Sequence, residues 1–183
     1  MSGAHRAERA EPEGRAAVAA TLTVDTAEAM RDLGRDLAAV LTPGDLVVLS
    51  GDLGAGKTTL TQGIGVGMQV RGEVTSPTFV IARVHPSTGD GPSLVHVDAY
   101  RLASLAEVDD LDLDASLAES VTVVEWGEGM VEELASDRIE LRLVRPHGAA
   151  GGPDAPPVEG DEPRTVEFAG FGARWDGVPL PPS

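Results

Sequence analysis

The stretch Gly51-Asp52-Leu53-Gly54-Ala55-Gly56-Lys57-Thr58 decides the fold of this chain, because it fits the pattern G-x-x-x-x-G-K-[ST] in full. An apolar run at residues 46–49 precedes it, and a helical pattern follows it to about Met68. A buried strand, a glycine-rich turn and a helix form the context in which this pattern binds phosphates. That context favours a phosphate-binding loop over a chance match in a chain with 22 glycines.

The residues of this loop have separate tasks toward a nucleotide. Lys57 is expected to reach the β- and γ-phosphates, the Thr58 hydroxyl to ligate Mg²⁺, and Thr59 to hydrogen-bond the α-phosphate. Lys57 is the only lysine, whereas the chain has thirteen arginines, and a compact ammonium suits a position among phosphates. Backbone N–H groups at the start of the helix are expected to bind the same phosphates. These backbone contacts come from Gly54, Ala55 and Gly56.

Two acidic residues follow buried strands and are candidates to complete the site. Asp98 follows the apolar run 94–97, and Glu125 follows the run 121–124. Ligands in α/β folds bind at the carboxyl ends of the strands. Asp98 is therefore predicted to hold the Mg²⁺ or its waters. Glu125 is predicted to be a second metal ligand or to orient the attacking water; an ordinary solvated acid is the alternative for each.

Three further features near these acids have weaker claims. His96 alternates with Asp98 along its strand, and a packed structural histidine is the favoured interpretation. Ser76-Pro77-Thr78 is either a switch-type contact to the γ-phosphate or metal, or an ordinary turn. Trp126 follows Glu125 directly and is interpreted either as a packing residue or as a residue at the nucleotide or partner face.

The order of the predicted elements favours an α/β fold. Strands are expected at 20–24, 46–49, 79–85, 94–97, 121–124, 138–145 and 165–168. Helices are expected after a cap at Asp25 or Thr26 and ending at Pro43-Gly44, after the phosphate loop, and over 102–117. The last two strands are expected to form an antiparallel hairpin. The predicted fold is a three-layer P-loop NTPase-like domain with a mixed, largely parallel central sheet.

Composition divides the chain into one domain with flexible flanks. Residues 1–20 are expected to be a disordered lead-in, 21–178 a single domain, and 179–183 a loose tail. The segment 146–163 is rich in Pro, Gly and acidic residues and is expected to be a flexible loop. There is no cysteine, which excludes a thiolate metal site and a cysteine nucleophile. No long apolar run predicts a membrane helix or a secretory signal, so a cytoplasmic protein is expected, monomeric by itself.

The charge of the chain argues against direct contact with nucleic acid. The net charge is −16, from 14 basic and 30 acidic residues, whereas nucleic acid and anionic membranes attract basic surfaces. Residues 101–140 hold twelve acidic residues against Arg101 and Arg138, a net of −10. A solvated helical surface is the favoured interpretation of this segment, and a docking face for a basic partner is the alternative.

Two other classes of P-loop protein fit this chain less well. A Ras-type GTPase reads guanine through N-K-x-D, and no lysine remains to supply that motif, so ATP is the expected nucleotide. A small-molecule kinase needs arginines in a lid, and the acidic segment after Asp98 is poor in arginine. A kinase and a non-catalytic nucleotide-sensing module both stay open as alternatives to an ATPase.

Four sequence blocks, taken together, resemble the TsaE (YjeE) family of bacterial P-loop ATPases. They are the phosphate loop extended to Thr59, Thr75-Ser76-Pro77-Thr78-Phe79, His96-Val97-Asp98-Ala99-Tyr100-Arg101-Leu102, and Val124-Glu125-Trp126. The blocks occur in the family's order and spacing, and the resemblance extends from about Val24 to Arg145. The N-terminal lead-in and the long loop at 146–163 lie outside it.

This resemblance implies a role in making N6-threonylcarbamoyladenosine at position 37 of tRNAs. It implies weak ATP hydrolysis alone and action through a TsaB–TsaD pair, with tRNA reached only through these partners. Lys57 then contacts phosphate, Thr58 and Glu125 are metal ligands, and Asp98 is the Walker-B-like acid. The resemblance also makes Trp126 functionally important, and it matches Thr26 to a nucleotide-side position. Family members carry a short loop before the last strand, so the long loop here leaves a nucleotide contact from Arg164 an open question.

Overall fold

A computed structural model describes residues 16–75, 82–99, 118–126, 135–145 and 162–181 of the chain. Several expectations lie outside these residues. They are the turn Ser76-Pro77-Thr78, the helix expected over 102–117, and most of the flexible loop expected at 146–163. The acidic segment 101–140 is described only in part, and its aspartates at 109, 110, 112 and 114 are not among the described residues.

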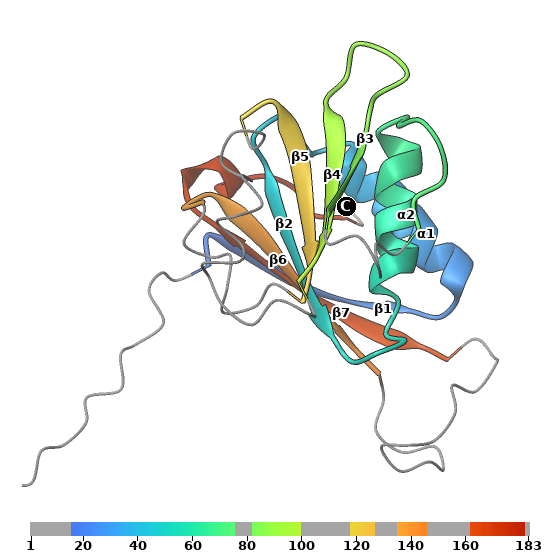
Figure 1. The fold of residues 1–183 in the computed structure, drawn as a ribbon. Coiled ribbons are helices and arrows are strands. Elements are labelled where there is room, and N and C mark those ends of the chain that lie inside the picture. The colour runs from blue at the N-terminus through green and yellow to red at the C-terminus, as the bar shows by residue number, and fades with distance from the viewer. Residues whose placement is uncertain (1–15, 76–81, 100–117, 127–134, 146–161, 182–183) are drawn as a thin grey trace, which may run out of the picture.

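A seven-stranded mixed sheet forms the framework of the described part (Figure 1). Its strands are β1 (Val18–Val24), β2 (Leu46–Gly51), β3 (Ala82–His85), β4 (Ser93–Asp98), β5 (Ser120–Glu125), β6 (Arg138–Val144) and β7 (Arg164–Phe171). They lie in the order β1-β7-β6-β2-β5-β4-β3. The four central strands β6, β2, β5 and β4 run parallel, and the outer strands add antiparallel pairs. The predicted mixed sheet and the antiparallel β6–β7 hairpin are thus confirmed.

Two helices, α1 (Ala27–Ala38) and α2 (Lys57–Gly67), lie together on one face of this sheet (Figure 1). They pack closely, since a Cβ added at Gly34 of α1 would lie 2.8 Å from the Cα atom of Gly63 on α2. Glycine at both positions lets the two backbones approach without a clash.

Apolar side chains cover both faces of the central strands. The larger cluster lies between the helices and the sheet and includes Leu37, Leu60, Leu141 and Phe168. A smaller cluster on the central strands is formed by Leu46, Val48, Val95, Val97, Ala99 and Val124. Strands that are buried on both faces read as continuous apolar runs, which is why these strands were recognisable in the sequence.

The structure corrects three expected boundaries. The strand β1 begins at Val18, two residues before the expected start, because it pairs along its whole length with β7. Helix α1 ends at Ala38, although Leu41 beyond it still packs in the larger cluster. The tail was expected to be loose from Pro179, but Leu180 is only 8% exposed and belongs to the same cluster. Burial of one leucine therefore anchors the tail at that point.

A buried ion pair connects the C-terminal 3₁₀ turn Ala173–Trp175 to the loop before β2. The Arg174 guanidinium donates to both carboxylate oxygens of Asp45, from Nε at 3.1 Å and from Nη2 at 2.9 Å. The backbone N–H of Thr42 also donates to Asp45, at 2.8 Å. These contacts satisfy a carboxylate that is only 3% exposed, so they tie two distant parts of the chain together.

No helix in the described part of the chain has the length and apolar character needed to cross a membrane.

Candidate functional site

The phosphate loop leaves the carboxyl end of β2 and enters the first turn of α2. Gly56 is the residue that caps α2, and its φ of 107° lies in a region that side-chain-bearing residues rarely adopt. Gly54 has a φ of 76° in the same loop. A Cβ at Gly56 would also approach the Met30 methyl group to 3.4 Å. The two glycines therefore allow a tight loop whose backbone N–H groups precede a helix N-terminus.

Lys57 lies buried at the centre of this loop. Its Nζ donates to the carbonyl oxygens of Gly51 at 2.8 Å and Asp52 at 3.0 Å. The same ammonium lies 3.8 Å from the centroid of the Trp126 ring. The Lys57 ammonium is therefore held between two loop carbonyls and the face of the Trp126 ring.

Burial of Lys57 lowers the pKa of its ammonium below the ordinary value, because desolvation disfavours the charged form. The negative charges of Glu125, Asp52 and Asp98 oppose this effect in that order. A phosphate placed beside the ammonium would add a further negative charge. Protonation of Lys57 and binding of a phosphate therefore favour one another.

Thr58 and Glu125 meet beside the loop, although 67 residues separate them in the chain. The Thr58 hydroxyl lies 3.2 Å from Oε1 and 3.4 Å from Oε2 of Glu125. Glu125 ends β5 and is nearly completely buried. On its other side, His96 of β4 places Nε2 2.8 Å from Oε1. The first turn of α2 and the neighbouring strands β4 and β5 thus bring three polar side chains together.

The neighbouring strand end places Asp98 beside Glu125. The two residues are directly paired in the parallel β4–β5 register. Asp98 is only partly exposed, and its charge acts on Lys57, as noted above. Two strand-end acids and the loop lysine are therefore brought together as expected from the order of the elements.

Trp126 follows Glu125 with an unusual backbone conformation. Its φ of 61° is left-handed, which is uncommon for a bulky residue. The backbone N–H donates to the Leu49 carbonyl oxygen of β2 at 2.9 Å, which holds the residue at the end of the strand. This turn carries the indole to the ammonium of Lys57. The left-handed turn therefore places Trp126 beside Lys57 at the phosphate loop.

The chemistry of the Thr58–Glu125 pair fits Mg²⁺. This ion prefers oxygen ligands and is usually held by one or two carboxylates together with substrate phosphates and waters. A threonine hydroxyl and a carboxylate beside a phosphate loop supply such ligands. Within the described ranges, no three His, Cys, Asp or Glu side chains gather as a metal cluster. The Thr58 hydroxyl and the Glu125 carboxylate could therefore supply two oxygen ligands to Mg²⁺.

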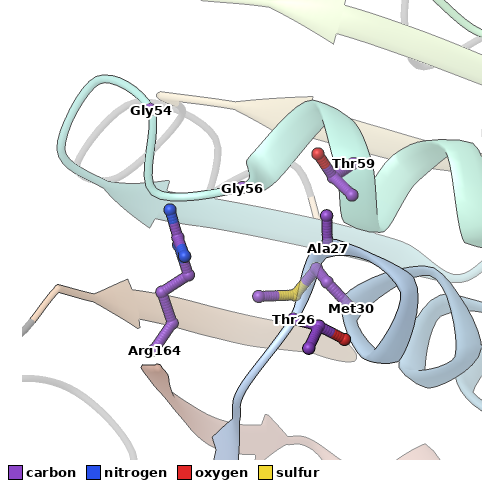
Figure 2. A pocket seen from close by; sticks show the side chains of 7 residues that line it. All are labelled: Thr26, Ala27, Met30, Gly54, Gly56, Thr59 and Arg164. Atoms are coloured by element: carbon purple, nitrogen blue, oxygen red, sulfur yellow. The ribbon is translucent and has the colours of Figure 1, made fainter. Parts of the chain in front are cut away.

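A cavity of about 100 Å³ adjoins the other side of the loop (Figure 2). It is lined by Thr26, Ala27, Met30, Gly54, Gly56, Thr59 and Arg164. Figure 2 shows the Arg164 guanidinium directed toward the loop between Gly54 and Gly56. The Thr26 hydroxyl accepts a hydrogen bond from the Ala29 N–H at 3.0 Å and thereby caps α1 at the edge of this cavity. The predicted nucleotide-side residues Thr26 and Thr59 therefore lie around one space.

One basic side chain near the loop was missed in the sequence. Arg145 follows β6, and its Nη1 lies 3.9 Å from the position of a Cβ added at Gly54. Its Nη2 is 2.8 Å from Oε2 of Glu162, whose backbone carbonyl also accepts from Arg164. The hydrogen bond from Arg145 lowers the pKa of Glu162. The only sequence signal was that Arg145 and Arg164 flank the loop expected at 146–163.

Comparisons with known proteins agree on one family. Residues 24–150 match the model of the family described as threonylcarbamoyl adenosine biosynthesis protein TsaE. The TsaE protein of Streptomyces coelicolor is 63% identical over 147 residues, covering 80% of this chain and 93% of that protein. The Mycobacterium tuberculosis protein of the same name is 47% identical over 146 residues, covering 75% and 87%.

A solved structure gives the same result for the fold. The crystal structure of YdiB from Bacillus subtilis superposes with a TM-score of 0.63 at 28% identity, covering 87% of this chain and 90% of that one. A family model that covers most of the chain, two close relatives and this structural neighbour lead to one conclusion: the chain belongs to the TsaE family.

Proposed function

We propose that this chain is a P-loop ATPase that serves tRNA threonylcarbamoyladenosine biosynthesis. The names of its relatives support the pathway. The observation that carries the activity is the contact between Thr58 and Glu125 beside Lys57. A hydroxyl, a carboxylate and an ammonium at a helix N-terminus are the groups that bind Mg²⁺ and the terminal phosphates of ATP.

Each residue of the site would contact a different part of ATP and its metal ion. Lys57 leaves the carbonyls of Gly51 and Asp52 and binds the β- and γ-phosphates, while the loop N–H groups bind the phosphate oxygens. Thr58 and Glu125 would hold Mg²⁺, and the ion would supply positive charge beside the phosphates. Asp98, beside Glu125, would hold the Mg²⁺ or its waters. The cavity at Thr26 and Arg164 takes the remaining part of the nucleotide.

The charge of the chain supports action through protein partners. A protein of net charge −16 repels tRNA, whose affinity for proteins depends on basic contacts. We therefore propose that the chain reaches tRNA only through a TsaB–TsaD-type complex in the cytoplasm, and that it is a monomer when alone. ATP turnover then serves to change the state of that complex.

Substitution of Glu125 tests the metal role. Glu125→Ala is expected to lower Mg²⁺-dependent ATP hydrolysis by about 100-fold or more while some nucleotide binding is retained, because Lys57 and the loop stay intact. Hydrolysis is measured by phosphate release and binding by a fluorescent ATP analogue. Glu167→Ala, an exposed carboxylate on β7, is the matched control.

Three outcomes separate this function from the alternatives. Normal turnover in Glu125→Ala would remove this residue from the site. ADP formation that depends on an added acceptor metabolite would favour a small-molecule kinase. Tight binding of ATP without turnover under every condition would favour a nucleotide-sensing module.

A further inference from the structure

His96 occupies a position that packing alone does not explain. Its side chain is 0% exposed at the middle of β4, among apolar residues of the sheet. A histidine is rarely placed there unless its ring nitrogens are used, because burying a polar ring without partners is costly. The ring has one strong contact, from Nε2 to Oε1 of Glu125 at 2.8 Å. That carboxylate is the proposed Mg²⁺ ligand.

The second ring nitrogen indicates where the proton lies. Nδ1 is buried and makes no hydrogen bond within the described part of the chain. A proton on Nδ1 would leave a buried N–H without an acceptor, which is unfavourable. A proton on Nε2 instead meets a carboxylate oxygen, which makes a strong charge-assisted hydrogen bond. His96 is therefore the donor and Glu125 the acceptor in this contact.

The contact also determines how the carboxylate is presented. Oε1 receives His96 from one side and lies 3.2 Å from the Thr58 hydroxyl on the other. Oε2 is 3.4 Å from the same hydroxyl. The last torsion of a glutamate side chain has a broad range unless a partner restricts it. The hydrogen bond from His96 restricts this torsion and holds the carboxylate beside Thr58.

We propose that His96 is a positioning residue, which orients Glu125 so that its carboxylate and the Thr58 hydroxyl bind one Mg²⁺ together. This inference rests on the proposed function. It predicts that loss of the Nε2 donor weakens Mg²⁺ binding and leaves the phosphate contacts of Lys57 and the loop unchanged. Hydrogen bonds to metal-ligating side chains contribute about 10-fold to 100-fold to metal affinity or activity.

The test compares His96→Leu, which removes the donor, with His96→Gln, whose amide N–H₂ can donate to Glu125. His85→Leu is the control, because His85 is a buried histidine on the adjacent strand β3. A fluorescent non-hydrolysable ATP analogue is titrated at increasing MgCl₂ and again in EDTA. Mn²⁺ bound to each protein–analogue complex is counted by electron paramagnetic resonance. Thermal unfolding of each variant reports its stability.

His96→Leu is expected to raise the half-saturating MgCl₂ concentration by about 10-fold or more, with the affinity in EDTA unchanged within about twofold. His96→Gln is expected to return the half-saturating MgCl₂ concentration most of the way to that of the unsubstituted protein, and His85→Leu to leave it unchanged. If His96→Leu does not fold, His96→Asn replaces it as the variant without a donor to Glu125. The Asn side chain is one methylene shorter than that of Gln, so its amide is not expected to reach the carboxylate.

Two results would overturn the inference. One is a half-saturating MgCl₂ concentration for His96→Leu that lies within twofold of the value for the unsubstituted protein, together with lower thermal stability. That combination describes a purely structural histidine. The other is a His96→Gln variant as defective as His96→Leu. If the unsubstituted protein binds the analogue equally with Mg²⁺ and with EDTA, the proposed function fails first. That result differs from both others because it appears before any substitution is made.

Discussion

Lys57→Ala is expected to lower the affinity for ATP by about 100-fold or more, because a charged hydrogen-bond donor to phosphate contributes about 1.5–3 kcal/mol per bond. The ammonium in the structure already lies at the loop, held by Gly51 and Asp52. Equilibrium binding of a fluorescent ATP analogue measures the loss, and Arg35→Ala on the exposed face of α1 is the control.

The composition of the chain allows a second measurement on the unsubstituted protein. Lys57 is the only lysine, so an amine-specific reagent modifies only this side chain and the α-amino terminus. Saturating ATP is expected to protect Lys57 from modification, as read by mass spectrometry. Equal modification with and without ATP, together with normal affinity in Lys57→Ala, would exclude Lys57 from the phosphate site.

Arg174→Ala is expected to lower the free energy of unfolding by about 3 kcal/mol, because it leaves a buried carboxylate without its charge partner. Asp45 is 3% exposed, and within the described residues its carboxylate keeps only the hydrogen bonds from Thr42 once Arg174 is removed. The estimate is at the low end of the usual range since the Arg174 side chain is 26% exposed. Urea unfolding measures the change.

Two further variants separate this ion pair from general loss of charge. Arg142→Ala removes an exposed arginine that lies 3.7 Å from Glu167, and is expected to change stability by less than about 1 kcal/mol. Asp45→Asn in the Arg174→Ala background is expected to recover part of the lost stability, because the unpaired charge is gone. An Arg174→Ala variant as stable as Arg142→Ala would contradict the account of this ion pair.

The parts of the site that lie close together in the sequence were predictable. The phosphate loop is one contiguous motif, and Thr26 is recognisable as a cap because a polar residue precedes a helical pattern. Asp98 and Glu125 follow apolar runs, and parallel strands bring such ends to one edge of the sheet. These predictions needed only local patterns and the order of the elements.

Contacts between distant segments were not predictable in the same way. The local pattern favours a packed histidine at position 96, and it does not indicate that the ring contacts Glu125 on the neighbouring strand β5. Arg145 meets Glu162 because β6 and β7 pair, which depends on the register of the hairpin. Burial of Leu180 also depends on where the chain returns after β7. Propensity and periodicity describe neighbours in sequence, whereas these contacts are set by packing.

The proposed role of the site at Lys57, Thr58 and Glu125 is to turn over ATP for a partner complex. The decisive measurement is ATP hydrolysis by the purified chain, with and without a TsaB–TsaD pair and tRNA. We expect slow Mg²⁺-dependent hydrolysis by the chain alone and a changed rate when the pair is added. If the chain does not bind the pair and hydrolyses ATP at the same rate in its presence and absence, this role is wrong.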